Sequence, residues 1–185
     1  EVMTQRIGLI YGTDTGNTEE VGNKIISNFD QAGKNVEMLN IADCDSDDIE
    51  AFDFIIMGIP TWDFGGIQED WEDFEDEIIA LNLQNKAVAF YGLGDQFGYS
   101  DYFIDAVGWL NERIKKTGAT VIGHWPTEGY DFDASLAANE DKSVFCGLAI
   151  DEDQQFELSD ERIKTWCEQI LEEFADVTEA LCDDL

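Results

Sequence analysis

The sequence predicts an α/β fold, a doubly wound parallel sheet with helices on both of its faces. One pattern predicts it, made of two kinds of segment. Short apolar runs alternate along the chain with segments in which apolar residues recur every three or four positions. Such alternation indicates βαβ units, whose right-handed crossovers place helices on both faces of a parallel sheet. Because no repeat or linker interrupts the pattern, we expect a single domain over residues 1–185, with its core at about 6–174.

The predicted strands are short, continuous apolar runs, which are typical of parallel sheets covered on both faces. In chain order they are Ile7–Tyr11, Val36–Leu39, Phe54–Ile59, Val88–Tyr91, Val121–His124 and Val144–Ile150.

Four segments with apolar residues at helical spacing are predicted to form amphipathic helices. Their apolar positions are Val21, Ile25, Ile26 and Phe29; Trp71, Phe74, Ile78 and Leu81; Phe103, Val107, Leu110 and Ile114; and Ile163, Trp166, Ile170 and Phe174. The acidic connection Ala42–Asp53 is expected to hold a short helix. We expect Asn17 to cap the first helix, with Glu20 as its capping-box partner, and Ser159 to cap the last. Residues 175–185 are expected to form an acidic tail beyond the last helix.

The charge of the chain limits its partners. There are 42 acidic and 10 basic residues, for a formal net charge of -32. Nucleic acids and anionic membrane surfaces are therefore poor partners, because like charges repel. Two explanations of the acidity remain, namely adaptation to high salt and docking to basic partner proteins.

Cysteine usage and the N-terminal segment indicate a cytoplasmic protein. The four cysteines form no C-x-x-C pair and have no histidine at metal-ligand spacing, so we expect free thiols and no metal. Residues 1–6 lack the apolar region of a signal peptide, and no stretch is apolar enough to span a membrane.

The first loop to consider follows the first predicted strand and opens a predicted helix. It consists of Thr13, Asp14, Thr15, Gly16, Asn17 and Thr18. Free backbone N–H groups and the helix dipole favour an anion at such a place, and the threonine hydroxyls add donors. The loop contains no Lys or Arg and matches neither the Walker A nor the dinucleotide-binding spacing. By itself it is equally compatible with a phosphate site and with an ordinary capped turn.

Two further loops follow predicted strands at the same edge of the sheet, where ligands of doubly wound proteins bind. One contains Pro60, Thr61, Trp62, Asp63, Phe64 and Gly65, and the other contains Gly92, Leu93, Gly94, Asp95 and Tyr99. Both combine glycine, an aromatic side chain and a carboxylate. Flat aromatic faces, a polar rim and a neutral anion site together predict a phosphorylated ligand with a planar ring.

These three loops, in this order and with these strand spacings, resemble the flavin-binding loops of the flavodoxin family. The resemblance runs from about Arg6 to Phe174. It implies the flavodoxin-like five-stranded sheet with strand order 2-1-3-4-5. The segment Pro126–Phe132 resembles the insertion that splits the last strand of long-chain flavodoxins. The segments Trp62–Gly65, Gln68–Glu72 and Leu158–Arg162 look most similar to the bacterial flavodoxin 2 group.

The resemblance implies a low-potential one-electron carrier that binds FMN non-covalently and moves electrons between a reductase and acceptor enzymes. Such a carrier is expected to be a monomer without substrate turnover of its own. Thr13, Thr15, Asn17 and Thr18, with the backbone of Asp14 and Gly16, would hold the phosphate. Trp62 and Tyr99 would sandwich the isoalloxazine ring. Asp95 and the backbone of Gly92–Gly94 would face the pyrimidine edge.

The resemblance also suggests how the redox potential is tuned. The fully reduced flavin is an anion, and aromatic faces, an un-neutralised phosphate and nearby carboxylates all disfavour it. Only charges close to the flavin change its potential strongly, because salt screens surface charges beyond about 8 Å at physiological ionic strength. In the family, a backbone carbonyl of the second loop turns toward the flavin on reduction. Here it belongs to the Asp63–Phe64 peptide, and the absence of glycine at position 63 makes that turn less favourable.

Three other functions share part of this pattern. A flavin-dependent NAD(P)H or quinone oxidoreductase needs a second nucleotide site, and the sequence has no fingerprint for one. A phosphoacceptor receiver domain needs an aspartate at the end of the third strand, where Met57–Pro60 provides none. A cofactor-free interaction module would be colourless and would not bind FMN.

Overall fold

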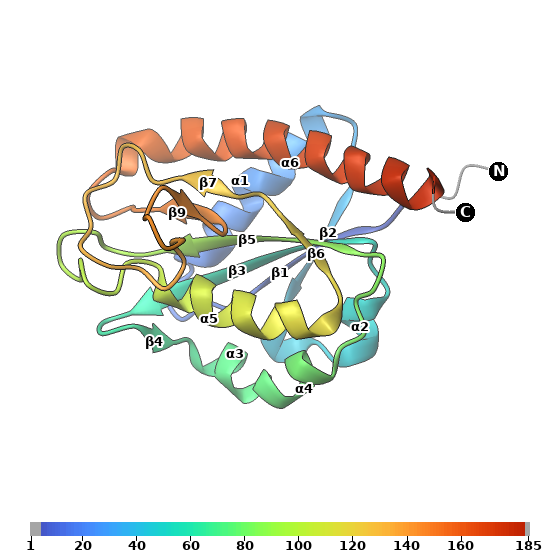
Figure 1. Cartoon of the computed structure of the whole chain (residues 1–185), viewed down its shortest axis with the longest axis horizontal. Helices are drawn as coiled ribbons and strands as arrows, with labels where there is room; N and C mark the ends of the chain where they lie inside the picture. The colour runs from blue at the N-terminus through green and yellow to red at the C-terminus, as the bar shows by residue number, and fades with distance from the viewer. Residues whose placement is uncertain (1–4, 184–185) are drawn as a thin grey trace.

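The computed structural model describes residues 5–183, and its central feature is a parallel sheet (Figure 1). The strand order is β2-β1-β3-β5-β6, with β9 also pairing with β5. These parallel strands are β1 (Ile7–Tyr11), β2 (Val36–Asn40), β3 (Phe54–Trp62), β5 (Ala87–Leu93), β6 (Thr120–Ile122) and β9 (Leu148–Ile150). The predicted order 2-1-3-4-5 is therefore confirmed, with β5 as the fourth strand and β6 and β9 sharing the fifth position.

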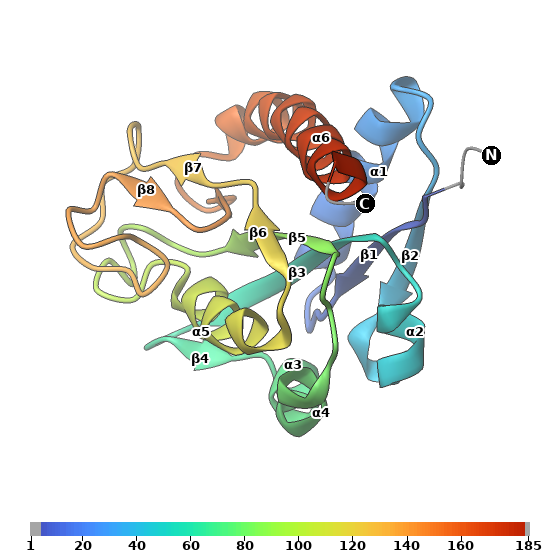
Figure 2. The same cartoon turned by 45° about the vertical axis from the view of Figure 1, so that its right-hand side comes forward.

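Helices cover both faces of the sheet, as Figures 1 and 2 show. One face carries α1 (Asn17–Gln31) and α6 (Ser159–Asp183). The opposite face carries α2 (Ser46–Glu50), α3 (Glu69–Asp73), α4 (Glu75–Ala80) and α5 (Asp105–Ile114). Short 3-10 turns lie at Ile41–Asp43, Lys115–Thr117 and Phe156–Leu158.

Successive strand residues pack into two separate cores, because side chains alternate between the faces of a strand. In β1, Leu9 packs with α1 and α6, whereas Ile10 packs in the other core. In β3, Ile56 and Met57 divide in the same way, and all four side chains are fully buried. The fully apolar runs predicted to be strands are thus apolar because both of their faces are covered.

The segment after the third strand differs from the prediction in two ways. Strand β3 continues to Trp62 and turns back into β4 (Gly66–Ile67), so the expected second loop is the end of a β-hairpin. The single helix expected from Trp71 to Leu81 is two short helices, α3 and α4, separated at Phe74. Phe74 has ψ 2°, outside the helical range, which separates the two helices.

The last strand is split, as expected, but with different bounds. β6 pairs with Ala87–Ala89 of β5, and β9 pairs with Tyr91–Leu93. The run Val144–Ile150 is not one strand, because β8 (Val144–Phe145) pairs with β7 (Trp125–Pro126) in a small separate sheet. The prediction of His124 within a strand was also wrong. Gly123 turns the chain away with φ 81°, and β6 ends before it.

The C-terminal helix is longer than predicted. α6 extends to Asp183, so the expectation of a tail beyond the last helix was wrong for residues 175–183, and residues 184–185 lie outside the described part. Ser159 begins α6 with helical dihedral angles, and its hydroxyl donates to Glu152 Oε2 at 3.1 Å. Ser159 therefore holds the preceding loop instead of capping the helix.

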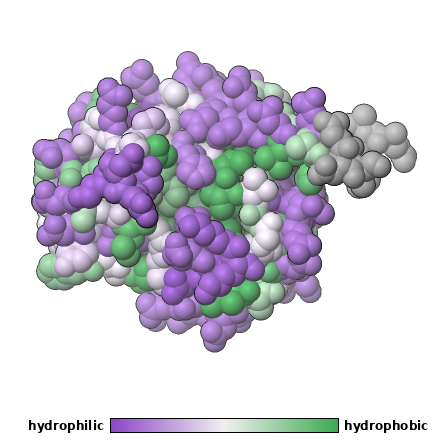
Figure 3. Space-filling model, in the orientation of Figure 1, coloured by the Kyte–Doolittle hydropathy of each residue, from purple (hydrophilic) through white to green (hydrophobic). Residues whose placement is uncertain are grey.

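The surface is mostly hydrophilic (Figure 3). Hydrophobic residues gather on the viewed face in a band across its middle, between more hydrophilic regions. Within residues 5–183 there are four ion pairs, which leave most of the 42 carboxylates without a cation. No helix in this part of the chain is long and apolar enough to cross a membrane.

Candidate functional site

The first turn of α1 has open backbone donors. Gly16, with φ 90°, is the N-cap, and no side chain caps the helix, so the predictions that Asn17 is the N-cap and Glu20 its partner were wrong. The Thr13 hydroxyl instead accepts a hydrogen bond from Gly16 N at 2.8 Å, which shapes the turn before the helix. A Cβ on Gly16 would meet nothing within 4 Å, so the space in front of the turn is free. N–H groups and a helix dipole facing open space are able to hold an anion.

The buried side chain of Tyr91 is hydrogen-bonded to this turn. The Tyr91 hydroxyl donates to the Thr18 carbonyl at 2.9 Å, and burial raises the pKa of Tyr91 well above its usual value. Tyr91 needs glycine at position 58, because a Cβ there would lie 2.1 Å from Tyr91 Cζ. The Thr18 side chain is 1% exposed, yet its hydroxyl has no hydrogen-bond partner among residues 5–183. It is a donor available to a ligand.

The hairpin between β3 and β4 forms one wall of the site. Its turn has positive φ at Asp63 (45°) and at Gly65 (85°), conformations that Asp, Asn and Gly adopt most readily. Trp62 is 36% exposed, and Phe64 is 77% exposed. The Thr61 hydroxyl accepts from Ala106 N at 3.0 Å, which fixes the hairpin to the start of α5.

The buried Gln68 joins the hairpin to the first loop. Its Nε2 donates to Asp14 Oδ1 at 3.2 Å and to Asp70 Oδ2 at 2.8 Å, while its Oε1 accepts from Trp71 N at 3.3 Å. The Asp14 side chain is therefore bonded to the neighbouring loop.

The third loop is held by Asp95. Its Oδ1 accepts from the backbone of Phe97 and Gly98 at 3.0 and 2.8 Å. Gln154 Nε2 donates to the same oxygen at 3.0 Å. Burial tends to raise the pKa of Asp95, but these hydrogen bonds outweigh it and lower the pKa below its usual value. The carboxylate thus stabilises its own loop and positions Tyr99, whose N–H donates to the Asp95 carbonyl at 3.1 Å.

Aromatic contacts join the hairpin to the third loop. The Phe64 ring meets Tyr99 and Tyr102 edge to face, with centroids 5.8 and 5.7 Å apart. The Asp63 carboxylate beside the Tyr99 hydroxyl raises the pKa of that phenol. The two walls are therefore in contact at the outer end of the site.

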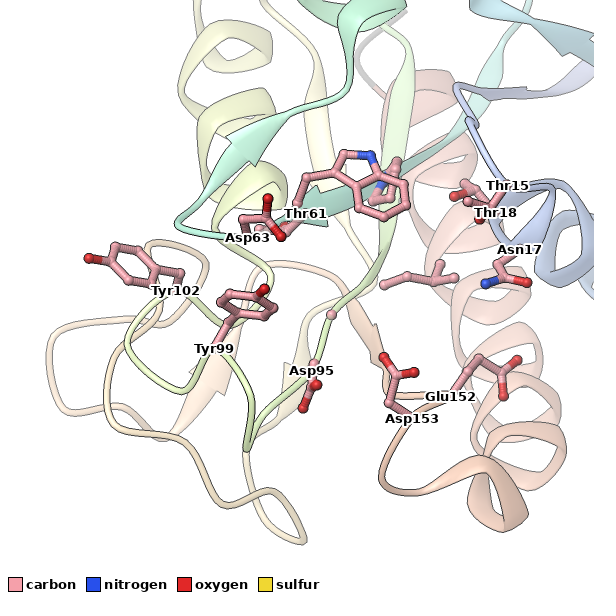
Figure 4. Close-up of a pocket in the computed structure, with 14 residues that line it drawn as sticks. Thr15, Asn17, Thr18, Thr61, Asp63, Asp95, Tyr99, Tyr102, Glu152 and Asp153 are labelled. Carbon is pink, nitrogen blue, oxygen red and sulfur yellow. The ribbon is translucent and has the colours of Figure 1, made fainter.

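The three segments enclose one cleft with about 770 Å³ of open space, including its solvent-facing mouth. The cleft is lined by Thr15, Asn17, Thr18, Pro60, Thr61, Trp62, Asp63, Leu93, Gly94, Asp95, Tyr99, Tyr102, Glu152 and Asp153. In Figure 4, Thr15, Asn17 and Thr18 lie at one end, and Tyr99 and Tyr102 lie at the other.

Eleven of the predicted residues line this cleft, and six lie beside it. Those beside it are Thr13, Asp14, Gly16, Phe64, Gly65 and Gly92. Three lining residues were not predicted, namely Tyr102, Glu152 and Asp153. The last two follow Asp151 in the loop after β9, so the rule that ligands lie beyond the carboxyl ends of strands could have found them. No feature of the sequence identifies Tyr102, because the orientation of its side chain depends on how residues 95–104 fold.

The cleft is acidic. It is lined by four carboxylates, from Asp63, Asp95, Glu152 and Asp153, and among the described residues no Lys or Arg lines it. Burial raises the pKa of Glu152, and burial together with the nearby charge of Asp95 raises the pKa of Asp153. Lys24 of α1 does not line the cleft, and it forms an ion pair with Asp160 of α6 at 2.8 Å. A bound group that gains negative charge here is disfavoured.

The structure offers no metal centre in its described part. Residues 5–183 contain no cluster of three or more potential metal ligands. Cys44, Cys146 and Cys167 are free thiols, and burial raises the pKa of Cys146 and of Cys167 to about 12. These thiols are therefore protonated and unreactive at neutral pH.

Comparisons with known proteins agree with this geometry. The model of the family described as Flavodoxin matches residues 9–166. Flavodoxin 2 of Escherichia coli K12 is 48% identical over 171 residues, which cover 92% of this chain and 97% of that protein. A flavodoxin of Synechococcus elongatus is 47% identical, covering 91% of this chain and 98% of that protein.

A solved structure shows the same architecture. Fusobacterium nucleatum flavodoxin bound to flavin mononucleotide has a TM-score of 0.86 and 27% identity, covering 92% of this chain and 99% of that one. A mutant of the same protein, also bound to flavin mononucleotide, has a TM-score of 0.85 and 28% identity, covering 92% and 97% of the two chains. From its sequence, its fold and its cleft, the chain belongs to the flavodoxin family and is an FMN-dependent electron-transfer protein that works with redox partners.

Proposed function

We propose that the cleft holds FMN with its phosphate at the first turn of α1 and its ring between Trp62 and Tyr99. The open donors at Gly16 and the unpartnered Thr18 hydroxyl support the phosphate position. The two aromatic residues lie on separate walls of the cleft, as a stacking site requires. Asp95 positions its loop, and the backbone at Gly94 and Leu93 faces the ring edge.

The protein's own residues orient the cofactor and tune it. Bound FMN supplies the one-electron chemistry, and the protein supplies position and electrostatics. Aromatic walls exclude water from the ring, while the carboxylates lining the cleft oppose added negative charge. The observation that carries the proposal of a low potential is this acidic lining without a cation.

Reconstitution and reductive titration test this function. Protein stripped of cofactor is expected to bind one FMN per chain and to become yellow. Reduction is then expected to proceed in two separate one-electron steps, the second at the lower potential. A protein that does not bind FMN, or that is reduced directly by NAD(P)H and turns over at a steady rate without a reductase, contradicts the proposal.

We also propose that partners dock over the mouth of the cleft through exposed aromatic residues within an acidic surface. Phe64, Phe97 and Phe156 are 77%, 58% and 65% exposed and lie on the segments around the cleft. From Asn35 to Asn85 the chain has fifteen carboxylates and no Lys or Arg. Basic redox proteins fit this surface. The proposal further places the protein in the cytoplasm as a single-domain monomer.

The two explanations of the charge predict different salt effects. Docking predicts that the second-order rate of electron transfer to a basic c-type cytochrome falls about 10-fold or more as salt rises to the molar range. High-salt adaptation predicts that the melting temperature rises instead, by about 2–4 °C for each 1 kcal/mol of repulsion relieved. Stopped-flow kinetics and calorimetry at the same salt concentrations measure both. A neutral small-molecule acceptor, whose rate salt should not change, is the control for docking.

Substitution of Asp63 is expected to change the potential in two separable ways. Asp63→Asn removes the charge but keeps a side chain that tolerates φ 45°, so the second reduction step should become less negative by some tens of millivolts. Asp63→Gly also frees the backbone, so the first step should shift upward as well. Spectroelectrochemical titration of both variants measures the two steps. Equal potentials in both variants and the native protein would show that this turn does not tune the flavin.

A further inference from the structure

Two fully buried polar side chains, Gln96 and Asp151, form a hydrogen-bonded pair next to the cleft without lining it. Gln96 lies in the loop after β5, and Asp151 directly follows β9. The backbone N and the side-chain Nε2 of Gln96 both donate to Asp151 Oδ2, at 3.0 and 2.8 Å. The pair therefore joins the ends of two neighbouring parallel strands.

The Asp151 carboxylate is held by N–H donors. Its Oδ1 accepts from Asp153 N at 3.1 Å and from Gln154 N at 2.9 Å. Within residues 5–183, none of the ion pairs involves Asp151. A buried carboxylate is costly unless its oxygens are hydrogen-bonded, so loop conformations that break these bonds are strongly disfavoured.

Gln96 also connects this pair to the insertion that splits the last strand. Its Oε1 accepts from Asp131 N at 2.6 Å. Each polar group of the Gln96 side chain therefore has a partner on a different segment. A shorter side chain, or an apolar one, would leave at least one of these buried partners without a hydrogen bond.

The pair is connected directly to residues that line the cleft. Asp153, which bonds Asp151, lines it, and so do Asp95 and Tyr99. Gln154 Nε2 reaches Asp95 Oδ1 at 3.0 Å, and Tyr99 N donates to the Asp95 carbonyl at 3.1 Å. The conformation of the Asp95–Tyr99 turn therefore depends on where the loop after β9 is held.

We propose that Gln96 and Asp151 are positioning residues that hold the Asp95–Tyr99 turn against the loop after β9 in the geometry that accepts the flavin ring. They act through Asp95, Tyr99 and Asp153 and do not touch the cofactor themselves. This inference rests on the proposed placement of the ring beside Tyr99.

Gln96→Glu is the most informative variant, because it replaces the amide donor with a second carboxyl group opposite Asp151. When both groups are ionised they repel, and we expect FMN to bind at least about 10-fold more weakly at about pH 8. At about pH 5 a proton shared by the pair restores a donor, and affinity is expected to return toward that of the native protein measured in parallel. Fluorescence titration of FMN measures both.

The native protein is measured at each pH because other charged groups lie close to the pair. Asp95, Asp131 and Asp153 surround the pair, and the charge of Asp151 also acts on Tyr130. Only the ratio of variant to native affinity reports on the pair. Hydrogen exchange of the cofactor-free protein is a second measurement, in which Gln96→Glu is expected to speed exchange in residues 95–99 and 151–154 at the higher pH.

Thr117→Val is a matched control for loss of a buried hydrogen bond. Thr117 is 4% exposed, and its hydroxyl donates to the Ile114 carbonyl at 2.5 Å, after α5 and away from the cleft. It is expected to lower the melting temperature without changing FMN affinity. If Gln96→Glu lowers only the melting temperature and binds FMN as the native protein does at both pH values, the pair is merely structural and the inference is wrong.

The outcome also separates this inference from the proposed site. Native protein that binds no FMN overturns the site itself. If Tyr99→Ala weakens FMN binding but Gln96→Glu does not, the proposed site stands and only the positioning role is wrong.

Discussion

Replacing Thr18 with valine is expected to weaken FMN binding about 10–100-fold, because a hydrogen bond to a charged group contributes about 1.5–3 kcal/mol. Thr18 is buried at the first turn of α1, lines the cleft, and has a hydroxyl without a partner among the described residues. Valine has nearly the same shape, so the change removes the donor and little else. Fluorescence titration of the cofactor-free protein with FMN measures the loss.

Riboflavin provides the decisive comparison, because it has the same ring but no phosphate. Thr18→Val should bind riboflavin as the native protein does, and Thr18→Ser, which keeps the hydroxyl, should bind FMN nearly as well as the native protein. An equal loss for FMN and riboflavin would place the phosphate elsewhere. Circular dichroism of each variant checks that α1 still forms.

Replacing Tyr99 with alanine is expected to weaken FMN and riboflavin equally. Stacking of a flat heterocycle on an aromatic side chain contributes about 1–3 kcal/mol, which corresponds to about 5–150-fold in affinity. Tyr99 has this effect because the turn beginning at Asp95 holds its ring at the wall of the cleft. The same titrations used for Thr18 measure it, with opposite selectivity between the two ligands.

Tyr99→Phe separates the ring from its hydroxyl. Phenylalanine keeps the aromatic face, so binding should stay close to that of the native protein, although the contact with Asp63 is lost. If alanine and phenylalanine weaken binding to the same extent, the hydroxyl and not the ring is the important group. If neither changes binding, Tyr99 does not contact the flavin.

Local patterns predicted the parts of the candidate site that belong to single loops. The Thr13–Thr18 segment was recognisable because a strand, a hydroxyl-rich turn and a helix are adjacent in sequence. Trp62 and Tyr99 were recognisable because parallel strands place the loops after them at one edge of the sheet. Eleven predicted residues therefore line a single cleft, although they come from three distant parts of the chain.

The two capping errors arose where a side chain nearby in sequence made a hydrogen bond that the local pattern did not predict. Asn17 was predicted to cap α1, but Thr13 bonds Gly16 and places a glycine at the N-cap instead. Ser159 was predicted to cap α6, but its hydroxyl bonds Glu152. In the first case Thr13 shapes the turn one residue before the predicted cap, and in the second Glu152 accepts from the hydroxyl that was predicted to cap the helix.

The sequence by itself determined the order of the main strands and helices, the edge of the sheet at which the cleft lies and the family to which the chain belongs. These follow from hydrophobic periodicity and from residue types in short loops, which are local properties. Only the tertiary structure decided that Glu152 and Asp153 complete the cleft and that Gln96 pairs with Asp151. The reason is physical: Gln96 and Asp151 are 55 residues apart in sequence, and their hydrogen bonds form only once β5 and β9 are paired.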